Sequence, residues 1–436
     1  MEDKIKKIFK HPLIAGSSTI FIGSLIANVF NFLFNIYMSR NLSVVDYGTL
    51  ASLVSIILLC ALAAESFVPT IVKFGGAFFA KQENNKIKGL FYLVNKLAAF
   101  FGISLFLLFF IFSNKISTFF NIKSTYLIVF TGVIVFCGFM SAVNRAILQA
   151  KLAFKYIAII GILSSILKLS LGIVLVYLGY KVNGAMWGFF LSFSAPYIFF
   201  LLSLRSYFVK EIISEHPVSV QKLFSYGGPS ALALLGLTFF ITTDIILVKH
   251  FYQAKQAGVY AGLSLIGRVI FFFSLPIGTV MFPLIVQKHT KQENYKGIFK
   301  LAICLVLFFS LMLTLFYFLF PEFSIRLFLK KDEYLILKSY LVPFGIFITL
   351  YSISSVMTNF FLSIHQTKVF IPILITASFQ AVLIWFYHET FSQIIQISIL
   401  SVSLLLISLL LYYWRLKGVI IDNNNEFLLK ENMFKS

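Results

Sequence analysis

The segment 301–320 reads LAICLVLFFSLMLTLFYFLF, twenty residues without a charged side chain. Because a helix rises about 1.5 Å per residue, this segment is long enough to cross the ~30 Å hydrocarbon core of a bilayer. Comparable apolar runs fill most of the chain and alternate with short polar segments. Backbone groups in lipid must bond within the chain, and the runs lack strict alternation, so they predict transmembrane helices and exclude a transmembrane barrel.

We expect twelve such spans, and the predicted fold class is therefore an all-α integral membrane protein. Of the 436 residues, 59% are hydrophobic and 12% are charged, against about 25% charged residues in a soluble domain. The first run is too long for a cleaved signal segment of roughly 7–15 apolar residues, so we expect it to be retained. The expected spans are 12–38, 48–74, 89–112, 125–147, 156–179, 183–204, 226–248, 259–286, 298–320, 339–363, 369–388 and 391–413.

The formal net charge of +20 lies mainly in the segments between the spans. Under the positive-inside rule these basic residues indicate orientation and not a nucleic-acid partner. One set of alternate segments carries 22 of the 36 Lys and Arg residues, the other carries 10, and four lie inside spans. Both termini are therefore predicted in the cytoplasm of a multi-pass inner-membrane protein. An even number of spans agrees with this, because it requires both termini to lie on the same side.

The chain also contains an internal repeat. The tetrapeptide KQEN at 81–84 recurs at 291–294, an offset of 210 residues, and at the same offset Gly48 corresponds to Gly258. Because 210 is close to half the chain and six is an even number of spans, the halves are predicted to be parallel six-helix lobes. Two such lobes around a central cavity are typical of an alternating-access transporter.

The repeat also sets the expected domain boundaries. We place the N-terminal lobe at 1–208, the C-terminal lobe at 209–414 and a cytoplasmic tail at 415–436, with the loop 205–225 as the hinge. Proline marks helix breaks at corresponding places in the two halves, at Pro69 in the second span and at Pro276 and Pro283 in the eighth. Broken helices at matching positions point to the mobile, site-forming segments of a transporter, although proline is also simply commoner in transmembrane helices.

The sequence shows no nucleotide-binding loop, metalloprotease motif or nucleophile elbow, so we do not expect an enzyme. The six histidines are scattered and the three cysteines fall inside apolar runs. No metal site and no cofactor is predicted from them.

Polar side chains inside spans are costly in lipid and therefore informative. In the first span their spacings of four, three and four residues place them on one helix face, and the tenth span repeats the pattern more weakly. Interhelical hydrogen bonding would explain them, but the row of amides favours helices that line a watery cavity. The expected lining residues are Ser24, Asn28, Asn31, Asn35, Ser355 and Asn359.

Charged residues within the spans are more often basic than acidic, which favours an anionic substrate. Lys168 and Arg268 lie deepest and are the first candidates for cations in the cavity, since a charge at that depth costs roughly 3 kcal/mol or more in lipid. Arg145 and Lys73 lie nearer the cytoplasmic ends, where they either join the cavity or extend to the interface. Glu65 is deep enough to pair with one of the cations or to carry a coupling proton.

Asp244 is the second candidate for ion coupling. It lies close to the outer end of the seventh span, where an ordinary interface residue would also be found. The basic and acidic candidates together predict a cavity that is positively charged overall.

Three stretches resemble a known family. YMSRNLS at 37–43 followed by Asp46-Tyr47-Gly48, FVPTIVKF at 67–74, and AGVYA at 257–261 with Arg268 look like segments of the Wzx-type repeat-unit flippases. These belong to the multidrug/oligosaccharidyl-lipid/polysaccharide exporter superfamily. The resemblance covers the whole chain, including the number of spans and the length. Arg40 and Arg268 fall inside the matched stretches, so the resemblance implies that they are cavity cations.

The resemblance implies a V-shaped cavity between two six-helix lobes in a bacterial inner membrane. The substrate would be an undecaprenyl-diphosphate-linked oligosaccharide, moved to the outer face for O-antigen or capsule synthesis by an H⁺ or Na⁺ gradient. Membrane lipids and the polysaccharide polymerase machinery would be its partners. Two alternatives stay open: a multidrug or cation antiporter of the same superfamily, and a membrane polysaccharide polymerase, which would be an enzyme.

Overall fold

The computed structural model describes residues 12–65, 67–204, 220–290 and 293–433, and within them the side chains outside 12–21, 69–70, 73, 220–227, 290 and 416–433. Throughout this part the secondary structure is helical. Lys291 and Gln292 of the second KQEN lie outside the described residues, as does most of the expected hinge together with the lobe boundary at 208 and 209.

All twelve expected spans are confirmed, since twelve of the described helices are long and apolar enough to cross a membrane. The helices of the N-terminal lobe are α2 (Pro12–Asn41), α3 (Val44–Glu65), α4 (Val68–Ala80), α5 (Asn84–Ile111), α6 (Ser113–Phe119), α7 (Thr125–Ala150), α8 (Phe154–Tyr177) and α9 (Lys181–Ser203). The C-terminal lobe contains α10 (Val220–Phe251), α11 (Ala254–Thr290), α12 (Lys296–Leu319), α13 (Pro321–Phe328), η2 (Asp332–Ser339), α14 (Leu341–Ser363), η3 (Thr367–Val369), α15 (Phe370–Phe386) and α16 (Phe391–Met433).

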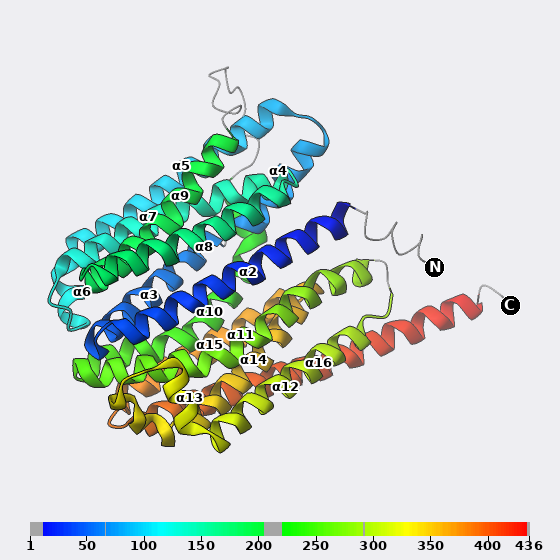
Figure 1. Cartoon of the computed structure of the whole chain (residues 1–436). Coiled ribbons are helices and arrows are strands. Elements are labelled where there is room, and N and C mark those ends of the chain that lie inside the picture. Colours follow the sequence, from blue (N-terminus) through cyan, green and yellow to red (C-terminus); the bar gives the residue numbers. More distant parts are fainter. Residues whose placement is uncertain (1–11, 66, 205–219, 291–292, 434–436) are drawn as a thin grey trace, which may run out of the picture.

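Two lobes of six spans each make up the molecule (Figure 1). They lie close together at the end that carries α6 and α13, which we call the closed end, and separate toward the end at which α2 begins, the divergent end. At the closed end α2 reaches across to the C-terminal lobe: Ser39 Oγ donates to the carbonyl of Phe328 (3.2 Å), and Lys331 donates to the carbonyl of Leu42.

The expected helix break in the second span is confirmed, but its counterpart is not. α3 ends at Glu65 and a new helix, α4, begins at Val68 with Pro69 in its first turn, where a missing N–H does no harm. In the other lobe α11 continues unbroken through Pro276 and Pro283, so the prediction of a matching helix break there was wrong. Transmembrane helices accommodate interior prolines because neighbouring groups satisfy the freed carbonyls.

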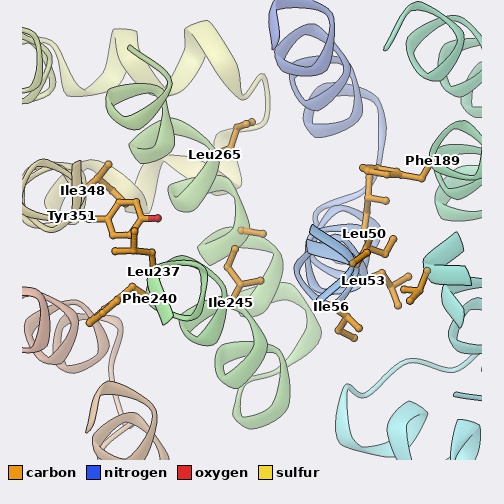
Figure 2. Close-up of a cluster of buried hydrophobic side chains, with 14 of the residues drawn as sticks. Leu50, Leu53, Ile56, Phe189, Leu237, Phe240, Ile245, Leu265, Ile348 and Tyr351 are labelled. Atoms are coloured by element: carbon orange, nitrogen blue, oxygen red, sulfur yellow. The ribbon is translucent and has the colours of Figure 1, made fainter. Parts of the chain in front are cut away.

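The buried apolar side chains of the two lobes form one continuous cluster (Figure 2). Leu50, Leu53 and Ile56 of α3 lie on the side of the N-terminal lobe, whereas Leu237 of α10 and Tyr351 of α14 meet within the C-terminal lobe. The cluster passes from one lobe to the other where α3 packs against α10 and α11.

The internal repeat appears in the helix boundaries and at the contact between the lobes. α2 and α10 end at residues 41 and 251, and α3 and α11 begin at 44 and 254, all at the offset of 210. The repeat-related glycines meet directly: a Cβ atom on Gly48 would lie 2.7 Å from the Cα of Gly258. Helix backbones approach this closely only where both partners lack side chains.

Candidate functional site

A pocket of about 260 Å³ lies within the N-terminal lobe, bordered by α2, α3, α7, α8 and α9. Most of its wall is formed by small side chains, which leaves the space open, and its polar groups converge from several helices. The polar residues that line it are Ser24, Glu65, Ser141, Arg145, Ser164 and Ser192.

The pocket contains an ion pair between Glu65, the last residue of α3, and Arg145 of α7. Arg145 Nη2 lies 2.5 Å from each carboxylate oxygen of Glu65. The two side chains keep 33% and 41% of their surface exposed, so water screens the pair and its contribution to stability is about 0–1 kcal/mol. An anion entering the pocket therefore meets a guanidinium whose existing partner is weakly held. Of the expected cations, Arg145 is the one that the structure places against Glu65.

A second pocket, of about 200 Å³, lies in the C-terminal lobe between α10, α11 and α14. Ser355 and Asn359, two of the expected lining residues, are part of its wall. Leu62 of α3 also lines it, so this pocket reaches the boundary between the lobes. The first pocket is lined by Ala61 and Glu65 of the same helix, so both pockets border α3.

The polar row on α2 faces the space between the lobes. Phe32 contacts Phe272 of α11, with ring centroids 5.7 Å apart, and Asn28 and Asn35 flank Phe32 on the same helix face. Asn28 is exposed, and Asn35 donates to the carbonyl of Asn31 (2.9 Å). Of the expected lining residues on α2, Ser24 lines the N-terminal pocket, whereas Asn28, Asn31 and Asn35 line neither of the two pockets.

Lys168 is buried inside the N-terminal lobe, with 6% of its surface exposed. Its Nζ lies 4.7 Å from the ring centroid of Phe34 and 4.4 Å from that of Phe189, in the cation–π range. It does not line either of the two pockets. The structure therefore places this expected cavity cation between α2, α8 and α9.

Replacing Lys168 with methionine should separate packing from charge, because the two side chains have similar lengths. A cation held between aromatic rings costs desolvation energy, so we expect Lys168→Met to keep the protein level and raise the unfolding temperature. If the charge serves transport, surface polysaccharide falls severalfold in the same cells. Immunoblotting and polysaccharide staining measure both, and unchanged polysaccharide would show that the charge is dispensable.

Asp244 and Arg268 form a second polar group in the C-terminal lobe, in which Asp244 is buried and Arg268 is partly buried. Asp244 accepts from the hydroxyl of Tyr260 (3.0 Å) and from the N–H of Ile245 (2.8 Å). Arg268 donates to the carbonyl of Ile241. Neither residue lines one of the two pockets, so this group lies apart from the ion pair of the N-terminal lobe.

Arg40 lies at the closed end, where its guanidinium donates to the carbonyl of Leu327 across the lobe boundary. Lys73 lies on α4, and its side chain is outside the described residues. Of the expected cations that the structure describes, Arg145 is therefore the one on a pocket wall.

Sequence reasoning missed Lys249, which it counted as a loop residue. Lys249 lies in the last turn of α10, keeps 1% of its surface exposed, and donates from Nζ to Thr49 Oγ1 of the other lobe (3.2 Å). Nothing in the sequence marks it, because a lysine at a helix end normally extends to water. Within the described part of the chain, no group of three or more His, Cys, Asp and Glu residues is arranged to hold a metal ion.

Residues 37–332, more than half of the chain, match the sequence model of a family described as polysaccharide biosynthesis protein. The chain belongs to this family. The resemblance to repeat-unit flippases drawn from residues 37–48 and 257–268 is thereby confirmed at the family level. No curated protein matches the sequence of this family member significantly.

Solved structures share the fold of this family member over nearly its whole length. The lipid II flippase MurJ in an inward closed conformation has a TM-score of 0.70 at 16% identity, covering 91% of this chain and 87% of its own. An inward-facing multidrug resistance MATE family transporter of the MOP superfamily has a TM-score of 0.68 at 16% identity, covering 90% and 96%. A MOP superfamily transporter from Pyrococcus furiosus has a TM-score of 0.65 at 17% identity, covering 92% and 96%. These likenesses establish the two-lobe fold, and family and fold together support a membrane flippase or transporter.

Proposed function

We propose that the protein flips undecaprenyl-diphosphate-linked oligosaccharide units from the cytoplasmic to the outer face of a bacterial inner membrane, for surface polysaccharide synthesis. The observation that carries the proposal is the half-exposed Arg145 on the wall of the N-terminal pocket. A guanidinium is suited to diphosphate because it is always charged and presents several donors. The family description and the likeness to a lipid II flippase support a lipid-linked substrate.

The lobes diverge at the end where α2 begins. The excess of basic residues on the side of the termini assigns that end to the cytoplasm. In this conformation the pockets would receive a substrate from the cytoplasmic leaflet. Its sugars would travel between the lobes while its lipid stays in the bilayer, which is why a transporter and not an enzyme fits the arrangement.

An H⁺ or Na⁺ gradient would supply the energy, with Glu65 as the coupling group. An anionic substrate competes with the Glu65 carboxylate for Arg145, and a proton or sodium ion on Glu65 would release the guanidinium. Asp244 is the second candidate, although its hydrogen bond to Tyr260 holds it in the core of the other lobe. The polysaccharide polymerase would be the partner that consumes the flipped units.

The test uses purified protein in liposomes and a fluorescent undecaprenyl-diphosphate-linked sugar whose outward movement is followed by quenching. We expect Arg145→Gln to lower the affinity about tenfold or more, because a hydrogen bond to a charged group is worth about 1.5–3 kcal/mol. Imposed H⁺ and Na⁺ gradients, applied in separate experiments, identify the coupling ion.

Lys155→Gln is the matched control, since it removes one cation from the exposed start of α8. Wild-type flipping by the Arg145 variant would contradict the proposed role of the pocket. Cation-driven export of drugs, without movement of the lipid-linked sugar, would instead establish the antiporter alternative that the MATE-like fold allows.

A further inference from the structure

The two pockets share part of their lining under the internal repeat. On α7 the lining residues Gly138, Ser141, Ala142 and Arg145 correspond, at an offset of 214, to the lining residues of α14, Ser352, Ser355, Val356 and Asn359. The same relation holds between the interface helices α3 and α11, where Ala61 and Glu65 correspond to Phe271 and Leu275 at the offset of 210.

The copies differ in charge. Where the N-terminal pocket has Glu65 and Arg145, the C-terminal pocket has Leu275 and Asn359. The residues that line the C-terminal pocket include no charged side chain, and its polar groups are hydroxyls and one amide. Such groups form hydrogen bonds with neutral partners and give an anion no compensating charge.

One hydroxyl of the C-terminal pocket has no protein partner. Ser352 lines the pocket with none of its surface exposed to solvent, and its Oγ forms no hydrogen bond within the described structure. A buried polar group left unsatisfied is unfavourable, so its presence points to a partner supplied from outside the chain. By contrast Ser354, two residues along the same helix, donates to the carbonyl of Leu350 (2.9 Å).

Aromatic rings complete the wall. Phe271 of α11 and Tyr351 of α14 both line the pocket, with ring centroids 5.1 Å apart and planes at 61°. The face of an aromatic ring carries partial negative charge and attracts the C–H groups of a ligand. Hydroxyls, an amide and aromatic rings together are the groups that recognise a sugar ring, whose rim is polar and whose faces are apolar.

We propose that the C-terminal pocket binds a neutral sugar ring of the substrate whose diphosphate lies on Arg145 in the N-terminal pocket. The inference rests on the proposed function and names the part of the substrate that each pocket takes. The pocket, with a volume of about 200 Å³, has room for a sugar ring.

Both pockets border α3, which contributes Leu62 to one and Ala61 to the other. These two residues are neighbours on the helix, so the pockets adjoin the same stretch of α3, and a sugar joined to a diphosphate would extend from one pocket to the other. The two pockets would thus bind different parts of one substrate headgroup: the charged diphosphate in the N-terminal pocket and the neutral sugar in the C-terminal pocket.

The test compares two probes on the purified full-length protein: undecaprenyl diphosphate, and undecaprenyl diphosphate carrying one N-acetylglucosamine. Wild type should bind the sugar-bearing probe about tenfold more tightly than the bare one. In Ser352→Ala with Asn359→Leu this preference should disappear, since two neutral hydrogen bonds account for roughly a factor of ten. The affinity for the bare diphosphate should remain as in wild type.

Ser354→Ala removes a hydroxyl from the same helix outside the pocket and should keep the full preference. Ser352→Ala alone is a smaller change and should lose part of the preference for the sugar-bearing probe. It takes the place of the double variant if that protein is poorly folded. An unaltered preference in the double variant, or an equal loss for both probes, would overturn the inference. Wild type that binds bare diphosphate with no gain from the sugar would overturn it while leaving the proposed function intact. Failure of wild type to bind either probe would refute both.

Discussion

Gly258→Ala is expected to abolish polysaccharide display while the protein still reaches the membrane. A Cβ atom on Gly258 would overlap the backbone carbonyl of Val44 in the other lobe. A side chain could relieve such an overlap by changing its rotamer, but helix backbone cannot. Overpacking typically costs 1–3 kcal/mol, and a clash with backbone belongs at the upper end, about 3 kcal/mol. That energy would change the equilibrium between lobes that meet at the closed end and lobes that separate there more than a hundredfold.

The measurement is the reactivity of a cysteine placed at the closed end. Leu42 is buried there, so Leu42→Cys, in a background without Cys60, Cys137 and Cys304, should resist an impermeant maleimide. Adding Gly258→Ala should expose the thiol, because α3 and α11 must separate where they cross. Gly48→Ala should act in the same direction, since its Cβ would lie 2.7 Å from the Cα of Gly258.

Gly297→Ala is the control, because a Cβ there would meet no atom within 4 Å. Protected Leu42→Cys together with normal polysaccharide in the Gly258 variant would show that the two helices adjust without consequence. The contact would then be ordinary packing and not the point at which the lobes hold each other.

The spans could be predicted from sequence because the thickness of the bilayer fixes their length, and apolar runs record that length directly. The segments 113–124 and 321–338 were expected to be loops, yet they contain α6, α13 and η2. Short helices that lie outside the bilayer carry polar residues on their exposed faces, so neither length nor hydropathy distinguishes them from loops. α13 begins with Pro321 and holds Glu322 between Arg326 and Lys338, whose hydrogen bonds lower the pKa of that carboxyl.

The repeat was visible in sequence at Gly48 and Gly258 because backbone contact tolerates no other residue there. Its effect on the pockets was not visible, since serines and asparagines at offsets of 210 and 214 are unremarkable by themselves. Helical spacing correctly placed Ser355 and Asn359 together, because residues four apart share a face whatever the fold.

Depth in the membrane, by contrast, does not determine which way a charge faces. Lys168 and Arg145 both lie within spans, yet one lies against Phe34 and Phe189 and the other reaches a pocket. That difference depends on which helices pack around each residue, and the order of residues along one helix does not specify its neighbours. Lys249 illustrates the same limit, since Thr49, whose hydroxyl oxygen accepts the hydrogen bond from Lys249, is 200 residues away.

Exchanging the two charges of the N-terminal pocket, by Glu65→Arg with Arg145→Glu, is expected to restore the ion pair without restoring transport. Each single change sets like charges against each other in a pocket of about 260 Å³. Arg145→Glu should lower flipping about tenfold or more through the lost charged hydrogen bond to the substrate, and Glu65→Arg should lower it because the coupling carboxylate is lost. The exchanged pair keeps the same charges and should recover the unfolding temperature and protein level of wild type.

Transport should stay low in the exchanged protein because the cation then projects from the end of α3, beside the break before α4, and no longer from the wall formed by α7. Liposome flipping and thermal unfolding, measured on the same preparations, separate the two roles. If flipping returned together with stability, the ion pair would have only a structural role, connecting α3 and α7, and other groups would have to bind the substrate. If stability returns without flipping, the position of the guanidinium on α7 is required for transport. The half-exposed ion pair then contributes little to stability, so an anion can replace Glu65 as the partner of Arg145 without unfolding the lobe.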